Sequence, residues 1–136
     1  MTIALALILR PSDGTLLIAR RRADAHLPNL WEFPGGKCRP EETPEACALR
    51  ETLEETGLSV SVLEVWPALT HVYPPTPPFP QRTVTLHPIL CRAESGDARP
   101  LGSLEIAWVL PADLGSHAFP EANGPLLARL RTRFEV

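Results

Sequence analysis

With 136 residues and a mass of 14.9 kDa, the chain is long enough to bury a core and too short for a second catalytic domain, so we expect one domain over residues 1–136. Hydrophobic residues make up 44% and charged residues 21% of the sequence, as in ordinary globular proteins. The net charge of −3 excludes a strongly basic nucleic-acid coat protein, but it leaves a single nucleotide open as a substrate.

The first third of the chain predicts two strands, a loop and a short extended piece. Apolar segments at 2–9 and 15–20 flank the turn sequence Pro-Ser-Asp-Gly, which is typical of a hairpin. The apolar run at 3–9 has only seven residues and no basic residue before it. We therefore interpret it as a buried strand rather than a signal peptide or a membrane span. Residues 31–34 predict an extended piece that ends at Gly35 and Gly36.

The clearest helix is predicted at 43–56. Thr43 suits the N-cap, Pro44 suits the first helical position, and Gly57 suits the left-handed residue after the last turn. Further strands are predicted at 59–65, 83–91 and 106–110, and an amphipathic helix is predicted at 124–134. Strands with two interspersed helices indicate an α/β domain in which helices cover a sheet.

Cysteine and proline usage add two expectations. Cys38, Cys47 and Cys91 are odd in number and include no closely spaced pair, so they indicate neither a disulfide framework nor a zinc site. We therefore expect a reducing compartment and predict a cytoplasmic location. Five of the 16 prolines fall in the segment 74–80, which predicts a loop between two strands.

The helix at 43–56 carries Glu51, Glu54 and Glu55 on one side of the helical wheel. Such neighbouring carboxylates repel one another by about 3 kcal/mol per pair at a dielectric near 20. The helix contains one basic residue, Arg50, which cannot neutralise three carboxylates, whereas a hard divalent cation such as Mg²⁺ can. The residues expected to face the core from the opposite pole of the wheel are Ala46, Leu49 and Leu53.

These glutamates belong to a longer pattern, which reads Gly36, five residues, Glu42, seven residues, Arg50-Glu51, two residues, Glu54-Glu55, one residue, Gly57. Seven fixed residues, each with a frequency of about 6%, match by chance with a probability on the order of 10⁻⁹ per start position. The pattern resembles the signature of the Nudix hydrolase family, whose fold is a mixed β-sheet sandwiched between helices (α/β/α). Thr52 departs from it, because the family has a bulky aliphatic residue at that position.

The resemblance implies hydrolysis of a phosphoanhydride bond with Mg²⁺, or Mn²⁺ in its place, as the cofactor. Arg50 is expected to orient neighbouring carboxylates, and Glu42 to pair with Arg50 or to reach a metal. Glu105 is open to two interpretations, a further metal ligand or base and an exposed loop acid. The implied metal ligands are the backbone carbonyl of Gly35 and the side chains of Glu51, Glu54 and Glu55.

Segments 29–37, 79–85 and 119–125 are similar to the MutT-type branch of the family, the 8-oxo-dGTP diphosphatases. That likeness implies a nucleoside triphosphate as the substrate and a monophosphate and pyrophosphate as the products. No nucleic-acid or membrane partner is implied, and the chain is expected to be a monomer or a homodimer. The residues implied to contact the nucleotide are Arg21, His26, Phe33, Arg82 and Asn123.

Asn123 has a chemical rationale. Guanine presents an acceptor at N7, whereas 8-oxoguanine carries a hydrogen there, and one amide can match N7–H and O6 together. The alternative is that Asn123 caps the terminal helix, because Gly-Pro follows it. For the whole chain, the alternatives are CTP or dCTP, ADP-ribose or a pterin triphosphate as the substrate, and a non-catalytic nucleotide-binding module.

Overall fold

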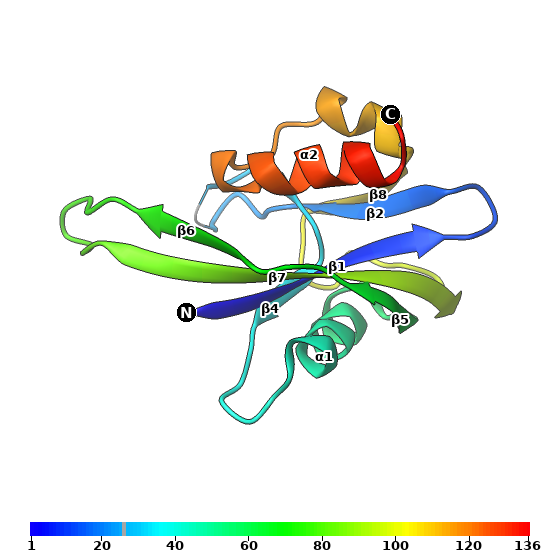
Figure 1. The fold of residues 1–136 in the computed structure, drawn as a ribbon, viewed down its shortest axis with the longest axis horizontal. Coiled ribbons are helices and arrows are strands. Elements are labelled where there is room, and N and C mark those ends of the chain that lie inside the picture. Colours follow the sequence, from blue (N-terminus) through cyan, green and yellow to red (C-terminus); the bar gives the residue numbers. More distant parts are fainter. Residues whose placement is uncertain (26) are drawn as a thin grey trace.

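Eight strands form one connected mixed sheet, and two helices cover it from opposite sides (Figure 1). The computed structural model describes residues 1–25 and 27–136. Strand β1 (Thr2–Arg10) lies at the centre, parallel to β7 (Arg82–Ser95) along most of its length. Its first half also pairs antiparallel with β4 (Gly35–Lys37), and its last two residues pair with β2 (Thr15–Arg20).

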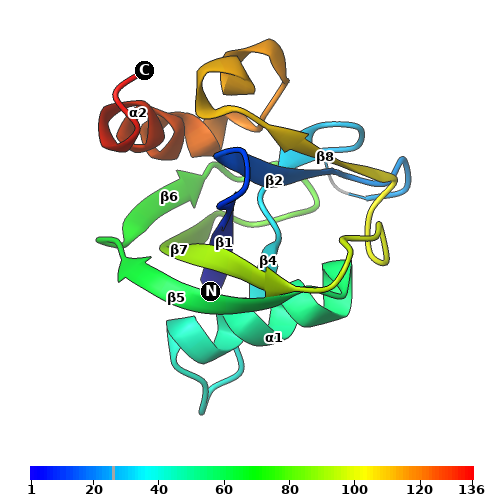
Figure 2. The same cartoon turned by 90° about the vertical axis from the view of Figure 1, so that its right-hand side faces the viewer.

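The remaining strands extend this centre in two directions. Strand β7 pairs antiparallel with β6 (Leu69–Tyr73) along its first part and with β5 (Ser59–Val65) along its last part. Strand β2 pairs antiparallel with β8 (Glu105–Val109) and with β3 (Trp31–Glu32). In Figure 2, β2 and β8 lie nearer the C-terminal helix, whereas β5 and β7 lie over the first helix.

Helices α1 (Pro44–Thr56) and α2 (Gly124–Arg133) cover separate hydrophobic clusters. Alternate side chains of β1 point to opposite faces, so Ala4 and Ala6 join the cluster under α1 and Leu7 joins the cluster under α2. This two-sided burial explains the continuous apolar run in β1. Two short 3₁₀ helices precede α2, at Pro111–Ser116 and Glu121–Asn123.

The elements match the predicted α/β class and include the predicted hairpin, but the predictions for Gly35–Gly36 and for the buried face of α1 are wrong. The hairpin is short, because β1 and β2 pair at Leu9–Leu16 and Arg10–Thr15 before each joins another strand. Gly35 and Gly36 do not end an extended piece but form β4 against β1. Strand β6 was not expected, because its pairing partner in β7 lies across the proline-rich loop. No helix in the described part of the chain is long and apolar enough to span a membrane.

Helix α1 has the predicted ends. The Thr43 hydroxyl accepts a hydrogen bond from the Ala46 amide at 3.2 Å, which caps the first turn. Gly57 follows the last turn with a φ of 77°, and its amide donates to the Leu53 carbonyl at 2.9 Å. The sequence therefore set both ends of this helix correctly.

The face that α1 turns to the sheet is not the predicted one. Leu53 is 54% exposed, Ala46 is exposed, and Leu49 is only half-buried. Small side chains face the sheet instead, and the helix packs closely against β4, where the Cys47 thiol lies 3.5 Å from the Gly36 carbonyl oxygen. The residues of α1 that are buried are Cys47, Ala48, Thr52 and Thr56.

Thr52 provides a stability prediction. Its hydroxyl is fully buried and has no hydrogen-bond partner among the residues that the structure describes. Thr52→Val keeps the shape and removes the unpaired hydroxyl, so it should raise the free energy of unfolding by about 1 kcal/mol. Thermal unfolding should show a melting temperature about 3–5 °C higher.

Thr56 is the matched control, one turn further along the same buried face. Its hydroxyl donates to the Thr52 carbonyl at 2.7 Å and accepts from the Leu58 amide at 3.2 Å. Thr56→Val should therefore lower the melting temperature. A fall for both variants would contradict the assignment of the Thr52 hydroxyl as an unpaired group.

Candidate active site

A cavity of about 740 Å³ opens across the first halves of the central strands. The floor of the cavity follows the pairing order β4-β1-β7-β6. It runs from Gly35 and Gly36, over Ile3 and Leu5, towards the β6–β7 hairpin. Seven of the residues singled out from the sequence line it, namely Arg21, Phe33, Gly35, Gly36, Glu55, Arg82 and Asn123. His26, also predicted to contact the nucleotide, lies outside the described residues.

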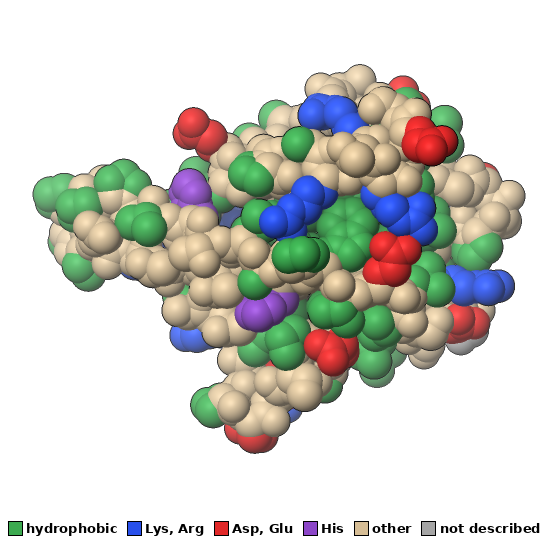
Figure 3. Space-filling view, in the orientation of Figure 1, with side chains coloured by type: hydrophobic (Ala, Val, Ile, Leu, Met, Phe, Trp, Pro, Cys, Tyr) green, Lys and Arg blue, Asp and Glu red, His purple; other side chains and the backbone are tan. Residues whose placement is uncertain are grey.

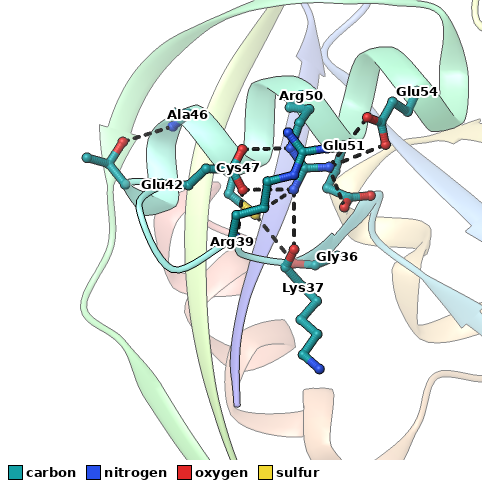
Figure 4. A network of polar contacts seen from close by, with 10 residues as sticks. Gly36, Lys37, Arg39, Glu42, Ala46, Cys47, Arg50, Glu51 and Glu54 are labelled. Carbon is teal, nitrogen blue, oxygen red and sulfur yellow. Dashed lines mark hydrogen bonds and ion pairs between the residues drawn. The ribbon is translucent and has the colours of Figure 1, made fainter.

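Arg50 is the centre of a polar network beside the cavity (Figure 4). Its guanidinium donates twice to the Glu42 carboxylate, at 2.6 and 2.8 Å, in a fork-shaped pair. It also donates to Glu51 at 2.9 Å and to Glu54 at 3.3 Å. A further bond to the Lys37 carbonyl at 3.3 Å ties the network to the end of β4. Arg50 thus orients carboxylates, and Glu42 is paired with it.

The Arg50–Glu42 pair predicts a pH-dependent stability. The Arg50 hydrogen bonds lower the pKa of Glu42 to about 2, so this carboxylate stabilises the fold above its unfolded pKa near 4.5. That contribution should disappear as the pH falls from about 4.5 to about 2. Glu42→Gln should therefore lower the melting temperature at pH 7 and have little effect near pH 2, as measured by thermal unfolding across this range.

The adjacent Glu41 serves as the control, because the pKa of Glu42 is the one lowered by Arg50. Glu41→Gln removes the same formal charge and leaves the fork-shaped pair intact, so its effect on stability should be small at every pH. Equal losses in the two variants at pH 7 would contradict a specific role for the pair.

Glu51 and Glu55 lie against β4, and the missing side chain of Gly36 makes room for Glu51. A Cβ on Gly36 would lie 2.5 Å from Cδ of Glu51, so any other residue there would displace this carboxylate. The Gly35 amide donates to Glu55 Oε2 at 3.2 Å. The pKa of Glu55 is raised to about 8, chiefly by burial and also by the nearby carboxylates of Glu32 and Glu51, against the effect of the Gly35 amide.

Glu32 was not singled out from the sequence. It lines the cavity and pairs with Arg21 at 2.7 Å, and burial raises its pKa although Arg21 acts in the opposite direction. An acid between two aromatic residues, Trp31 and Phe33, just before the glycine pair is the signal that could have identified it.

The carboxylates fit a hard divalent cation by their chemistry. The donors are all oxygens, and the effect of Glu32 and Glu51 on the pKa of Glu55 shows negative charge crowded around this carboxyl. As they stand, no three His, Cys, Asp or Glu side chains within 1–25 and 27–136 are arranged as a metal centre. Glu51 and Glu54 instead accept from Arg50, and the Glu54 side chain is 55% exposed. The individual ligand roles therefore stay predictions.

The other end of the cavity is aromatic and carries one buried amide. Phe33 is held by stacking on Phe119, with ring centroids 5.3 Å apart. Asn123 is only 9% exposed, and its side chain makes no capping hydrogen bond to α2 within the described chain. Its backbone is helical, with φ −86° and ψ −4°, whereas an N-cap residue has an extended backbone.

The proline-rich loop belongs to the same cavity. Tyr73, Thr76 and Phe79 line it, and the Arg82 guanidinium lies 5.2 Å from the centroid of the Tyr73 ring. Thr76 and Phe79 exchange backbone hydrogen bonds of 2.9 and 2.6 Å, which close the tip of the β6–β7 hairpin. Figure 3 shows apolar side chains gathered at this tip, where it projects from the body of the protein.

Glu105 lies apart from these residues. It is the first residue of β8 and pairs with Arg20 at 3.0 Å, with its side chain 49% exposed. It is not among the residues that line the cavity in the described chain. The geometry therefore favours the interpretation as an exposed acid over the interpretation as a further ligand or base.

Comparison with known proteins agrees with this geometry. Residues 1–130 match the family model described as NUDIX domain. The 8-oxo-dGTP diphosphatase of Escherichia coli K12 is 34% identical over 124 residues, which cover 91% of this chain and 92% of that protein. The 8-oxo-dGTP diphosphatase of Proteus vulgaris is 39% identical over 79 residues, 58% of this chain and 65% of that protein. A solved structure from work on MutT of Aliivibrio salmonicida and Vibrio cholerae superposes with a TM-score of 0.76 at 25% identity, covering 96% of this chain and 95% of that one.

Proposed function

Because the chain belongs to the Nudix hydrolase family, we propose that it is a Mg²⁺-dependent nucleoside triphosphate diphosphatase that hydrolyses 8-oxo-dGTP to the monophosphate and pyrophosphate. The observation that carries this proposal is one cavity that joins the carboxylates beside Gly35 to the buried amide of Asn123. Its curated relatives with this activity support it. The enzyme would act on the nucleotide pool of the cytoplasm, as a monomer or homodimer.

The polar end of the cavity supplies the groups that phosphoanhydride hydrolysis needs. When bound through Glu51, Glu54, Glu55 and the Gly35 carbonyl, Mg²⁺ or Mn²⁺ supplies neutralisation of phosphate charge and a more acidic attacking water. Arg50 holds Glu51 and Glu54 in place, so it acts as a positioning residue. Arg21 presents a guanidinium at the cavity, and its bond to Glu32 fixes its direction.

The aromatic end of the cavity binds the nucleoside in this proposal. The stacked pair Phe33–Phe119 gives a rigid wall for a base, and Arg82 gives a cation near the hairpin. The Asn123 amide would accept from N7–H of 8-oxoguanine and donate to O6. Because this amide is buried, guanine would place its N7 acceptor against the amide oxygen, which is also an acceptor. Its binding would be weaker by about 1–3 kcal/mol per unsatisfied group.

A panel of substrates tests the proposal. Product release from 8-oxo-dGTP, dGTP, CTP, dCTP, a pterin triphosphate and ADP-ribose is measured with Mg²⁺ and again with excess EDTA. Pyrophosphate should be released fastest from 8-oxo-dGTP, and EDTA should abolish release. Faster release from another compound would identify that compound as the substrate instead of 8-oxo-dGTP. No release from any of them would favour a non-catalytic nucleotide-binding module.

A further inference from the structure

Strand β4 and helix α1 pass each other in opposite directions, in register. The Gly35 amide bonds to Glu55, and the next residue of the strand, Gly36, lies directly beneath Glu51. Moving forward along β4 therefore corresponds to moving back along α1. The face shared by the two elements is set by these contacts.

This register brings Cys38, the residue that follows β4, close to Cys47. Residues two apart in a strand share a face at a spacing of about 6.6 Å, and four residues of helix advance by about 6 Å. Cys38 is two residues after Gly36, and Cys47 is four residues before Glu51. The two cysteines are therefore the next pair along the same face, although nothing in their sequence spacing suggests a pair.

Contacts agree with the register. The Cys47 thiol points to β4 and donates to the Gly36 carbonyl at 3.5 Å (Figure 4). Cys47 is fully buried, and Cys38 is a half-buried residue that packs against the same cluster. Burial, followed by the neighbouring Cys38 thiol, raises the pKa of Cys47 to about 12, so Cys47 stays protonated at neutral pH. Cys38 is the thiol that a small oxidant from solvent meets first.

We propose that Cys38 and Cys47 are an oxidative modification site, at which a hydroperoxide converts the two thiols into an intramolecular disulfide. The Cys38 sulfur attacks the peroxide, the O–O bond breaks, and a sulfenic acid forms as water or an alcohol leaves. The Cys47 sulfur then attacks the sulfur of Cys38, the S–O bond breaks, and the thiol proton leaves with the hydroxyl as water. Two thiols and one hydrogen peroxide give one disulfide and two waters.

The disulfide closes a ring from Cys38 to Cys47 that contains Glu42, the partner of Arg50. It fixes the end of β4 to the first half of the helix that carries the candidate metal ligands. A cross-link of this loop length constrains the unfolded chain and so stabilises the fold. Peroxides also oxidise guanine nucleotides, so this helix would be held most firmly under the conditions in which oxidised nucleotides form.

Intact and peptide mass spectrometry test the site on the full chain. The protein is treated with hydrogen peroxide, denatured without reductant and alkylated with N-ethylmaleimide. Apart from the added N-ethylmaleimide, we expect a monomer about 2 Da lighter than the reduced protein. One thiol, Cys91, should be alkylated, and peptide mapping should show a cross-linked peptide joining Cys38 to Cys47. Dithiothreitol should reverse the change, and the oxidised protein should melt about 5 °C higher than the reduced protein.

Two variants serve as controls. Cys91→Ser should form the disulfide like the wild type, and Cys38→Ser should leave Cys47 open to alkylation after peroxide and denaturation. The proposal is overturned if Cys38 ends as sulfinic acid while Cys47 remains alkylatable, or if the cross-links join separate chains. A lower melting temperature after oxidation would also overturn it. None of these measurements depends on the enzyme's substrate.

Discussion

Glu55→Gln should lower kcat/KM for 8-oxo-dGTP by about 10³-fold or more and yet stabilise the metal-free protein. Gln keeps the size and the acceptor for the Gly35 amide, but it cannot carry the charge that a bound cation requires. The side chain lines the cavity from the last turn of α1. Steady-state kinetics with Mg²⁺ measures the first effect.

The stability effect has the opposite sign because the pKa of Glu55 is raised to about 8. Such a carboxyl stabilises the fold below its unfolded pKa near 4.5, and this stabilisation is lost as the pH rises to about 8. The metal-free wild type should therefore become less stable across this window. At pH 8 the variant should be more stable by about 2–4 kcal/mol, as measured by denaturant unfolding in EDTA.

Glu41→Gln is the control, because it removes an equal charge from the exposed segment before α1. It should retain near-normal turnover and show no gain in stability. Turnover near the wild-type value in Glu55→Gln would contradict the role of this carboxylate, and a loss of stability in EDTA would contradict its raised pKa.

Asn123→Ala should remove most of the preference for 8-oxo-dGTP over dGTP. The variant loses a buried donor and acceptor together, each worth about 1–3 kcal/mol when mismatched, so the ratio of the two kcat/KM values should fall about 10²-fold. Because the Asn123 side chain makes no capping hydrogen bond to α2 in the described chain, the free energy of unfolding should change little. Kinetics with both triphosphates and a thermal melt separate the two effects.

The neighbouring Glu121 lies in the same short 3₁₀ helix and is exposed. Glu121→Gln should leave the ratio unchanged. An Asn123→Ala enzyme that retains the full preference would show that the base is read by another residue, whereas a large loss of stability would indicate a structural role for the amide.

The features that were predicted best from the sequence are those determined by local chemistry. Thr43, Pro44 and Gly57 define the ends of α1 through backbone preferences that act within one turn. The fixed spacing of the acidic pattern identified the family, and residues 1–130 match its model. Phe33 and Asn123, taken from segments far apart in the chain, do line one cavity.

Contacts between distant segments were not predictable in the same way. A helical wheel ranks faces by hydrophobicity, but the face of α1 that packs on the sheet carries Cys47 and Ala48, whereas Leu53 is exposed. Strand β6 is defined by its pairing with β7, and the Cys38–Cys47 register depends on how β4 and α1 pass each other. These features require the tertiary structure.

The most direct test of the proposed activity is the ratio of kcat/KM for 8-oxo-dGTP to that for dGTP, measured on the wild-type protein with saturating Mg²⁺. Two mismatched groups at a buried amide predict a ratio of about 10² or more. A ratio of one or less would contradict the assignment of this cavity to the oxidised base.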